Sequence, residues 1–252
     1  VMAVGYLLLA LWVLAINITR IPALLELIFR SAFSLDAGLG GLFGSTIMMG
    51  IKRGLFSNEA GEGSTPNVAA TASVSHPVKQ GLIQTLGVFT DTLVICSATA
   101  LIILLGSGDS AGLSGIALTQ SALDSEVGRG AGSIFISIAI FFFAFTSIVA
   151  NYYYGETNIK FFTSDRRIII GYRICVAAMV FVGACSTLDF VWAFADITMG
   201  LMTLCNLIAI MVLGRYAVIL LGDYRTQLRS GRDPVYHSST IPSISSRTTA
   251  WP

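Results

Sequence analysis

GLFSNEAGEGSTPN, residues 54–67, puts glycine, amide and carboxylate groups into a chain that is otherwise apolar enough for a membrane. A lipid bilayer offers no hydrogen bonds to the backbone, so an unwound segment at that depth is tolerated only where it is buried in protein or lines a cavity. We therefore interpret this stretch as a break in a membrane helix at which a solute or ion binds. A surface loop between two helices is the alternative interpretation.

The composition predicts an all-α polytopic membrane protein. Hydrophobic residues make up 54% of the chain and charged residues 12%, whereas an ordinary soluble domain carries about 25% charged residues. The formal net charge of +1 gives no reason to expect a nucleic-acid partner. The hydrophobic composition makes membrane lipid the expected surrounding of the chain. The four cysteines fall in apolar runs without the paired spacing of a zinc or redox site, and we expect them to be small core residues.

Apolar runs predict a transmembrane domain over residues 1–230, followed by a disordered cytoplasmic tail over residues 231–252, where Ser, Thr and Pro are frequent. Residues 22–33 carry apolar side chains every three to four positions and are expected to form a short helix at the membrane interface. The expected spans are residues 1–16, 39–53 joined with 66–74 as one discontinuous span, 78–105, 133–154, 171–184 and 191–213.

The apolar run opens directly at Val1, with no basic segment before it. A signal peptide needs such a segment and a cleavage site of small residues after the apolar run. We therefore expect no signal peptide here, and we expect the chain to lack its true start.

Two helix ends are expected to face each other across the break. Thr65 followed by Pro66 is a typical helix start, a cap followed by a first-turn proline. The carbonyls that end the first half-helix and the amides that begin the second carry opposite partial charges of about half an electron. This arrangement suits a zwitterion: the amides can hold a carboxylate, and the carbonyls with Ser57 and Asn58 can take an ammonium group or a sodium ion.

Charged residues in and near the break have two interpretations. Glu59 and Glu62 are either a cation site or counter-charges to Lys52 and Arg53, which come just before the break within a span. A lone charge in a span costs about 2.5 to 3.5 kcal/mol by insertion scales, so both cations need a partner or a water-filled cavity. We favour the counter-charge role for the two glutamates.

Thr146 and Ser147 place two adjacent hydroxyls in the middle of a span, and Asn151 lies one turn beyond Ser147. Hydroxyl and carbonyl oxygens can replace the water shell of a sodium ion. The alternative is that these hydroxyls bond back to carbonyls four residues earlier in the helix. Asp91 and Asp196 are further acids in apolar runs, and each belongs either to a proton relay or to a hydroxyl-bonded contact that fixes helix packing.

Lys and Arg residues predict which side of the membrane each loop faces. Cytoplasmic loops carry the excess of these residues. Ten of the 15 fall on one side of the predicted spans and three on the other, so we place the carboxyl terminus in the cytoplasm and the loop 106–132 outside. The ten are Lys79, Lys160, Arg166, Arg167, Arg173, Arg215, Arg225, Arg229, Arg232 and Arg247, and the three are Arg20, Arg30 and Arg129.

No residue set supports catalysis. The two histidines, His76 in a loop and His237 in the tail, give no combination of Ser, His and Asp for hydrolysis. The sequence GEGST at residues 61–65 lacks the lysine and the spacing of a phosphate-binding loop. We therefore expect a protein that is not an enzyme, with no catalytic residue and no cofactor.

Five long motifs resemble the alanine/glycine:cation symporter family in the family's order, and the resemblance spans nearly the whole chain. They are RGLFSNEAGEGSTPN, HPVKQGLIQTLGVFTDTLVICSATALIILL, FFFAFTSIVANYYYGETNIKFF, FVWAFADITMGLMTLCNLIAI and DYRTQLRSGRDPVY. The resemblance implies a five-plus-five inverted-repeat fold, of which this chain would be the second part with its discontinuous helix. It also implies symport of alanine or glycine with sodium, or with protons in some members, across the plasma (inner) membrane.

The resemblance also implies site residues. Phe56 matches the aromatic side chain that covers the substrate, and residues 57–61 match the unwound backbone around it. Thr146 and Ser147 match the hydroxyl ligands of a sodium ion, and Asn151 matches a pocket position that is tryptophan in some members. Cys205 stands where the family motif has proline. The implied substrate-binding set is Phe56, Ser57, Asn58, Ala60, Gly61, Ser147 and Asn151, and the implied sodium set is Thr146 and Ser147.

By the same resemblance, the family's first discontinuous helix lies in an amino-terminal repeat that this chain lacks and that activity needs. The expected partners are a small neutral amino acid and sodium as coupling ion. Two further hypotheses are a natural half-length subunit that pairs with another membrane chain, and an accessory membrane scaffold without a solute site.

The predicted sidedness can be tested with reporter fusions. A reporter fused after Arg232 is expected to be active only in its cytoplasmic form, and a reporter at Asp109 only in its external form, because the basic loops follow the positive-inside rule. Activity of the same form at both positions would contradict this topology.

Overall fold

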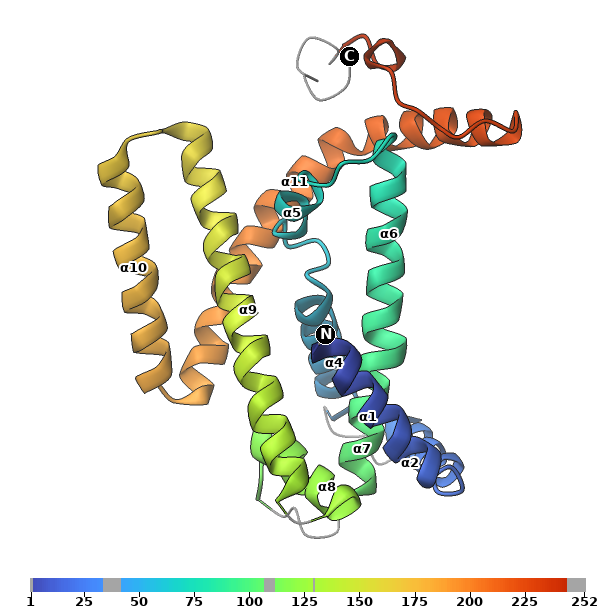
Figure 1. The fold of residues 1–252 in the computed structure, drawn as a ribbon, viewed down its shortest axis with the longest axis vertical. Helices are drawn as coiled ribbons and strands as arrows, with labels where there is room; N and C mark the ends of the chain where they lie inside the picture. Colours follow the sequence, from blue (N-terminus) through green and yellow to red (C-terminus); the bar gives the residue numbers. More distant parts are fainter. Residues whose placement is uncertain (1, 34–41, 107–111, 129, 244–252) are drawn as a thin grey trace. The chain divides into compact units, whose positions relative to one another are not determined.

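A computed structural model of the chain describes residues 2–33, 42–106, 112–128 and 130–243, and within them it contains helices and no strand (Figure 1). The all-α prediction is confirmed. The helices are α1 Met2–Ile16, α2 Ile21–Phe33, α4 Leu42–Asn58, α5 Thr65–Ala69, α6 Pro77–Thr90, α7 Ser97–Leu105, α8 Gly115–Val127, α9 Ala131–Phe162, α10 Arg166–Cys185 and α11 Leu188–Arg229. A π-helical turn, η1 Asp91–Cys96, joins α6 to α7, and a 3-10 turn, η3 Ser238–Thr240, follows α11.

Four helical stretches are long and apolar enough to cross a membrane: Pro77–Leu105, Ala131–Phe162, Arg166–Cys185 and Leu188–Arg229. Helices α1 and α2 meet the same criterion only as a pair, which is bent by 99° at the break between them. The chain is therefore a multi-pass membrane protein. The inverted-repeat relation of these helices to an earlier half stays a prediction.

The break is shorter than the sequence predicted. Helix α4 continues through Gly54 and ends at Asn58, so Ser57 and Asn58 lie in its last turn and the expectation of unwound backbone there is wrong. The second helix begins at Thr65 with Pro66 in its first turn, as predicted, but ends at Ala69 instead of Val74. Between α4 and α5, residues 59–64 are non-helical. The expected start of the first half-helix, Leu39, lies outside the described residues.

Three other helices extend beyond the expected spans, among them α10, which begins at Arg166 instead of Gly171. Helix α9 continues to Phe162, eight residues past the expected end at Tyr154. Helix α11 has 42 residues and runs through Gly214 to Arg229, where we had expected the span to stop at Leu213. Good helix formers, including Leu, Arg and Gln, follow the apolar part of α11, so the helix continues after the hydrophobic run ends.

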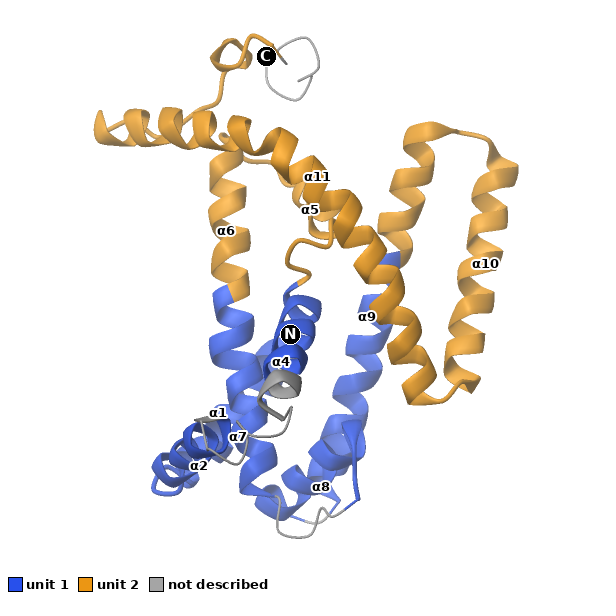
Figure 2. Ribbon diagram, turned by 180° about the vertical axis from the view of Figure 1, so that it is seen from behind, with its two compact units in different colours: residues 1–58, 89–151 blue, residues 59–88, 152–252 orange. Residues whose placement is uncertain are grey.

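The described chain forms two compact units, residues 1–58 with 89–151 and residues 59–88 with 152–252 (Figure 2). In the first unit, buried residues of α1, α7, α8 and α9 form one hydrophobic cluster: Ala10, Val13, Ala98, Ile102, Leu105, Ala122, Leu123 and Ile136. Gly106 permits this packing, because a Cβ atom there would lie 2.4 Å from the Cα of Ala122. Asp124 accepts hydrogen bonds from the hydroxyl and the amide of Ser133, and these bonds lower the pKa of the Asp124 carboxyl.

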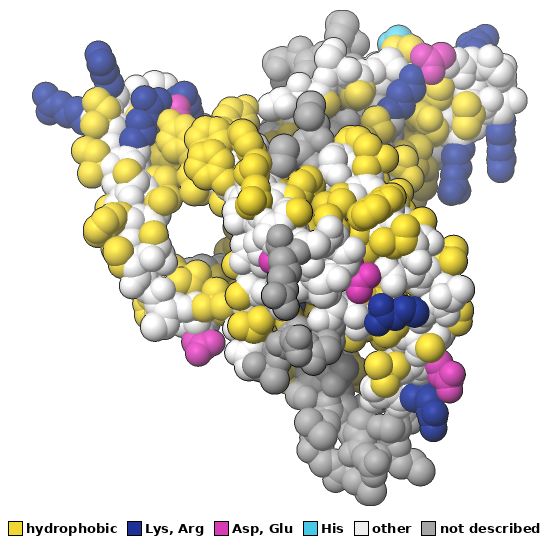
Figure 3. Space-filling view, turned by 60° about the horizontal axis from the view of Figure 1, so that its bottom comes forward, with side chains coloured by type: hydrophobic (Ala, Val, Ile, Leu, Met, Phe, Trp, Pro, Cys, Tyr) yellow, Lys and Arg dark blue, Asp and Glu magenta, His cyan; other side chains and the backbone are white. Residues whose placement is uncertain are grey.

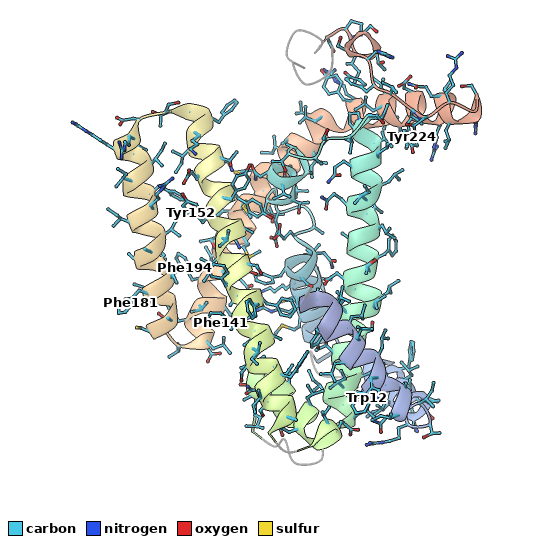
Figure 4. The ribbon with its side chains drawn as sticks, in the orientation of Figure 1. Trp12, Phe141, Tyr152, Phe181, Phe194 and Tyr224 are labelled. Atoms are coloured by element: carbon cyan, nitrogen blue, oxygen red, sulfur yellow. The ribbon has the colours of Figure 1, made fainter. Side chains whose placement is uncertain are left out.

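In the second unit, α9 and α10 form a hairpin held by polar contacts. Arg173 on α10 donates to both carboxylate oxygens of Glu156 on α9 at 3.1 Å. The ring of Tyr172 stacks on the ring of Tyr152 with centroids 5.9 Å apart (Figure 4). A Cβ atom at position 155 would lie 2.0 Å from the Tyr172 hydroxyl, so Gly155 leaves the space that this side chain occupies.

A strap formed by residues 233–241 packs against the start of α6 in the second unit. The amide of Tyr236 donates to the carbonyl of Ser75 at 2.9 Å, and the Ser75 hydroxyl donates to the carbonyl of Pro234 at 3.0 Å. His76 is fully buried and makes edge contacts with the rings of Tyr224 and Tyr236. Figure 4 shows Tyr224 where α11 passes the first turn of α6.

The strap is the described part of the tail that we expected to be disordered. The side chain of Gln227 on α11 holds the strap with two hydrogen bonds. Its Nε2 donates to the carbonyl of Val235 at 2.9 Å, and its Oε1 accepts from the backbone amide of Val235 at 3.0 Å. Lys79 adds an ion pair with Asp233. Disorder over residues 231–252 stays a prediction, and residues 244–252 lie outside the described part of the chain.

Large hydrophobic side chains cover much of the surface, as Figure 3 shows for one face. Phe141, Phe181 and Phe161 are 67%, 71% and 86% exposed, and Phe181 projects away from α9 (Figure 4). In a membrane such side chains contact lipid. All four cysteines are also free and exposed, so the expectation that they are core residues is wrong. An apolar run in a membrane helix does not distinguish lipid contact from protein contact.

Replacement of Tyr236 by alanine is expected to release the strap, because the ring loses its burial and its contact with His76. Truncating a buried aromatic side chain costs about 3 to 5 kcal/mol. When the strap opens and closes faster than the protease cleaves, the cleavage rate follows the fraction of molecules with a released strap. Trypsin cleavage after Arg232 should therefore become at least about ten-fold faster. Limited proteolysis of the purified protein in detergent measures this rate. Val235→Ala, at an exposed neighbouring position whose backbone bonds remain, is the control. Equal cleavage of the Tyr236 variant and the parent protein would show that the strap does not form.

Candidate functional site

The non-helical segment, residues 59–64, has backbone conformations that a helix excludes. Gly61 and Gly63 have φ angles of 83° and 94°, and Glu59 has a φ angle of 48°, in the left-handed region that non-glycine residues rarely occupy. The carbonyls and amides here therefore lack the regular helical partners. Ala60 and Gly61, which the sequence assigned to substrate binding, lie in this segment and are half-buried.

Glu59 stabilises the turn from within. One of its carboxylate oxygens accepts a hydrogen bond from the Ser64 hydroxyl at 2.6 Å and one from the Thr65 hydroxyl at 3.3 Å. This places a negative charge near the first turn of α5, where the helix dipole favours it. The Thr65 hydroxyl is used in this contact and does not cap a backbone amide. Glu59 thus has a structural role in the turn.

Glu62 and Ser64 are the buried polar residues of the segment, 5% and 8% exposed. The amide of Glu62 donates to the carbonyl of Glu59 at 3.4 Å. Within the described residues, no hydrogen bond or ion pair of the Glu62 carboxylate is found in this unit. Its two interpretations, cation site and counter-charge, stay open.

Helix α11 supplies a further contact to the segment. The side-chain amide of Asn206 donates to the carbonyl of Gly61 at 2.9 Å. Asn206 lies in one of the family motifs, but the sequence predicted no role for it. An amide in the middle of an otherwise apolar membrane helix is the signal that could have identified it, because such a group needs a polar partner.

In the other unit, the last turn of α4 is bound to the π-helical turn η1. Ser57 donates to the carboxylate of Asp91 at 2.5 Å. Asn58 donates to the hydroxyl of Thr92 at 2.9 Å and to the carbonyl of Gly54 at 2.8 Å. Ser57 and Asn58, two of the predicted substrate ligands, therefore use their hydrogen-bonding groups for contacts within the protein in this conformation.

Asp91 is positioned by the π-helical turn, which covers six residues in the middle of the span 77–105. A π-helical turn inserts one residue into the helical register and often occurs at functional sites. Of the two interpretations given for Asp91, the structure shows an acid bonded to a hydroxyl. The hydroxyl belongs to Ser57 on α4, so the contact joins two helices.

The predicted sodium ligands lie on α9. The Thr146 hydroxyl bonds back to the carbonyls of Phe142 and Phe143 at 2.9 and 3.0 Å, which is the alternative that the sequence left open. Asn151 donates to the carbonyl of Ser147 at 2.9 Å. Thr146, Ser147 and Asn151 are all exposed on the helix surface. In the described part of their unit, no hydrogen bond joins them to Ser57 or Asn58.

Phe56, predicted to cover the substrate, lies in the last turn of α4 and is 37% exposed. The described residues therefore carry the predicted site in three pieces. These are the last turn of α4, the non-helical segment 59–64 and the polar residues Thr146, Ser147 and Asn151 of α9.

Comparison with known proteins identifies the family of the chain. The sequence model of the sodium:alanine symporter family matches residues 1–238. The probable sodium/glutamine symporter GlnT of Bacillus subtilis is 50% identical over 242 residues, which cover 96% of this chain and 50% of that protein. The amino-acid carrier protein AlsT of the same organism is 49% identical over 249 residues, covering 99% of this chain and 53% of the relative.

A more distant relative is the sodium/alanine symporter AgcS of Methanococcus maripaludis, which is 38% identical over 221 residues, 86% of this chain and 48% of that protein. The chain thus spans about half the length of these curated relatives. The relatives are carriers and not enzymes. The match over residues 1–238, together with identities up to 50%, confirms the resemblance found in the motifs: the chain belongs to the sodium:alanine symporter family.

Proposed function

We propose that these residues belong to a transporter that carries a small neutral amino acid, alanine or glycine, together with sodium across the plasma (inner) membrane. The observation that carries the proposal is the non-helical segment 59–64, which offers backbone polar groups to a ligand within a chain of this family. In apolar surroundings, such groups recognise the charged ends of an amino acid without the cost of a buried side-chain charge.

The roles proposed for individual residues follow from their chemistry. The backbone of Ala60 and Gly61 is proposed to bind the amino and carboxylate groups of the solute, and Phe56 to cover its apolar side. Ser57 and Asn58 hold the end of α4 against Asp91 and Thr92, and they reach the solute only if these contacts rearrange. Ser147 and Asn151 are proposed to contact the solute from α9.

Sodium is the proposed coupling ion, with Thr146 and Ser147 as ligands. The back-bonding of Thr146 does not oppose this role, because a hydroxyl that donates its hydrogen still has lone pairs to offer a cation. Donation to the carbonyls of Phe142 and Phe143 in fact turns the hydrogen away and leaves the oxygen accessible. The names of the relatives support sodium coupling for the family.

Glutamine is a second candidate substrate. The relative with 50% identity is named a probable sodium/glutamine symporter, whereas the relative named a sodium/alanine symporter is 38% identical. Asn151 supports this candidate, since its side-chain amide offers both a donor and an acceptor to the amide of a glutamine side chain, whereas tryptophan at this position offers only a donor. Competition of unlabelled alanine, glycine and glutamine against each labelled amino acid distinguishes the two candidates.

We further propose that transport needs the part of the transporter that corresponds to the other half of the relatives, because this chain spans about half of their length. The cytoplasmic placement of the carboxyl terminus is proposed from the distribution of Lys and Arg.

The proposed roles of Phe56 and the α9 hydroxyls predict two different defects in the complete transporter. Thr146→Ala with Ser147→Ala should raise the sodium concentration needed for half-maximal uptake about ten- to a hundred-fold, because contacts to a charged group contribute about 1.5 to 3 kcal/mol each. Phe56→Ala should chiefly weaken binding of the amino acid. Linkage makes the coupling reciprocal, so each variant also disturbs the other affinity to a lesser degree.

Sodium titrations at saturating amino acid, followed by amino-acid titrations at saturating sodium, separate the two effects. Thr198→Val is a matched control, because the Thr198 hydroxyl also bonds back within its own helix and has no proposed ligand role. A double hydroxyl variant that keeps the sodium dependence of the parent would show that these hydroxyls only serve helix packing.

The chain of 252 residues alone is expected to give no sodium-driven uptake above background when expressed in membranes. Uptake of labelled alanine and glutamine into vesicles with and without a sodium gradient measures this. Sodium-dependent uptake by these residues alone would refute the proposed need for the other half.

A further inference from the structure

Asn206 is a polar residue in the middle of α11, flanked by Leu204, Cys205, Leu207 and Ile208. A side-chain amide at this depth is unfavourable unless both of its polar ends find partners in protein or water. The partner of its N–H group is the Gly61 carbonyl, at 2.9 Å, in a segment that has no regular helical hydrogen bonds. Each group thus satisfies a need of the other.

The segment also lies directly against the Asn206 side chain. A Cβ atom built on Gly63 would lie 3.0 Å from Cγ, 3.1 Å from Cβ and 3.2 Å from Oδ1 of Asn206. Contacts that short require the neighbour to move. Gly63 also has a φ angle of 94°, so both its conformation and its packing call for glycine.

The other hydrogen bonds of the segment are local. Glu59 accepts from Ser64 and Thr65, and Asn67 donates to the carbonyls of Ser64 and Gly63. These bonds determine the shape of the turn, and Asn67 in addition accepts a hydrogen bond from the side-chain amide of Asn158 on α9 at 3.2 Å. Among the described residues of this unit, the hydrogen bond that joins residues 59–64 directly to α11 comes from Asn206.

We propose that Asn206 is a positioning residue for solute recognition: through Gly61 and Gly63 it holds the backbone of residues 60–61 in register with α11. This inference rests on the proposed function in taking that backbone as the solute site. Asn206 itself touches neither solute nor ion. It acts by keeping the backbone groups of Ala60 and Gly61 in the place where they can bind both ends of an amino acid.

Two measurements on the complete transporter test the proposal. The first is hydrogen exchange of the amides of residues 59–64, measured by mass spectrometry on the protein in lipid nanodiscs, which requires no transport. Asn206→Leu keeps the approximate size of the side chain and removes its donor, and we expect exchange in this segment to become about ten-fold faster, in line with the loss of one buried hydrogen bond. Thr198→Val, in the same helix, is the control and should leave this exchange unchanged.

The second measurement is uptake per transporter molecule. Asn206→Leu should raise the KM for the amino acid about ten-fold and leave the maximal rate within about two-fold, since the defect lies in recognition. A residue that only supports folding would lower the amount of protein and the maximal rate instead. If Asn206→Leu does not reach the membrane, Gly63→Ala tests the same contact from the opposite side, and it should change exchange and KM in the same way.

The possible outcomes separate this inference from the proposed function. Unchanged exchange of residues 59–64 in both variants would overturn the positioning role. Faster exchange with an unchanged KM would overturn the link to recognition. If the parent transporter shows no sodium-driven uptake of any amino acid, the proposed function fails, whereas the exchange data still decide whether Asn206 holds the segment.

Discussion

The backbone groups of residues 59–64 need hydrogen-bond partners, because this segment of a membrane chain lacks the regular hydrogen bonds of a helix. A buried polar group without a partner costs about 1 to 3 kcal/mol, and a whole domain is stable by only about 5 to 15 kcal/mol. Several unpaired groups would therefore consume most of the stability. Asn67 on α5 and Asn206 on α11 donate hydrogen bonds to carbonyls of the segment. The glycines supply its backbone angles.

Other polar groups in the apolar helices also connect one element to another. Asp91 binds Ser57 of α4, and Glu156 binds Arg173 of α10. These side chains are engaged in contacts within the protein, and the proposed solute site therefore relies on backbone groups of the segment and on the hydroxyls of α9. A transporter that recognises the two charged ends shared by all amino acids has good reason to use backbone for this purpose, since side-chain identity is then free to select the substrate.

The sequence predicted much of the fold because the dominant physical signal in a membrane chain is hydrophobic length. The span 78–105 agrees with the structure almost to the residue, and the Thr-Pro start of α5 is correctly placed. Helix ends were predicted less well. The sequence predicted that the first half-helix ends before Gly54. A glycine inside a helix costs only about 1 kcal/mol, and α4 continues to Asn58. Likewise, α11 continues beyond the apolar run because helix formation does not require hydrophobic residues.

The sequence predicted which segments are candidates for the site, but not which contacts their side chains make within the protein. Which hydroxyl an acid meets depends on how two distant helices pack, so the pairing of Asp91 with Ser57 could not be derived from spacing. The π-helical turn has no sequence signature comparable to a cap, and no role was predicted for Asn206, whose partner lies in a segment 145 residues earlier in the chain. Asking where every amide in an apolar helix finds its partner would have identified it.

If the non-helical segment binds the solute together with sodium, both ligands should protect a cysteine placed in this segment from labelling by a thiol reagent. In a complete transporter with its native cysteines replaced, Ala60→Cys would be labelled with a small thiol reagent in sodium, in sodium with the amino acid, and in potassium with the amino acid. The account predicts a labelling rate that falls several-fold only when sodium and amino acid are both present. Equal rates in all three conditions, in a variant that binds or transports the amino acid, would contradict it.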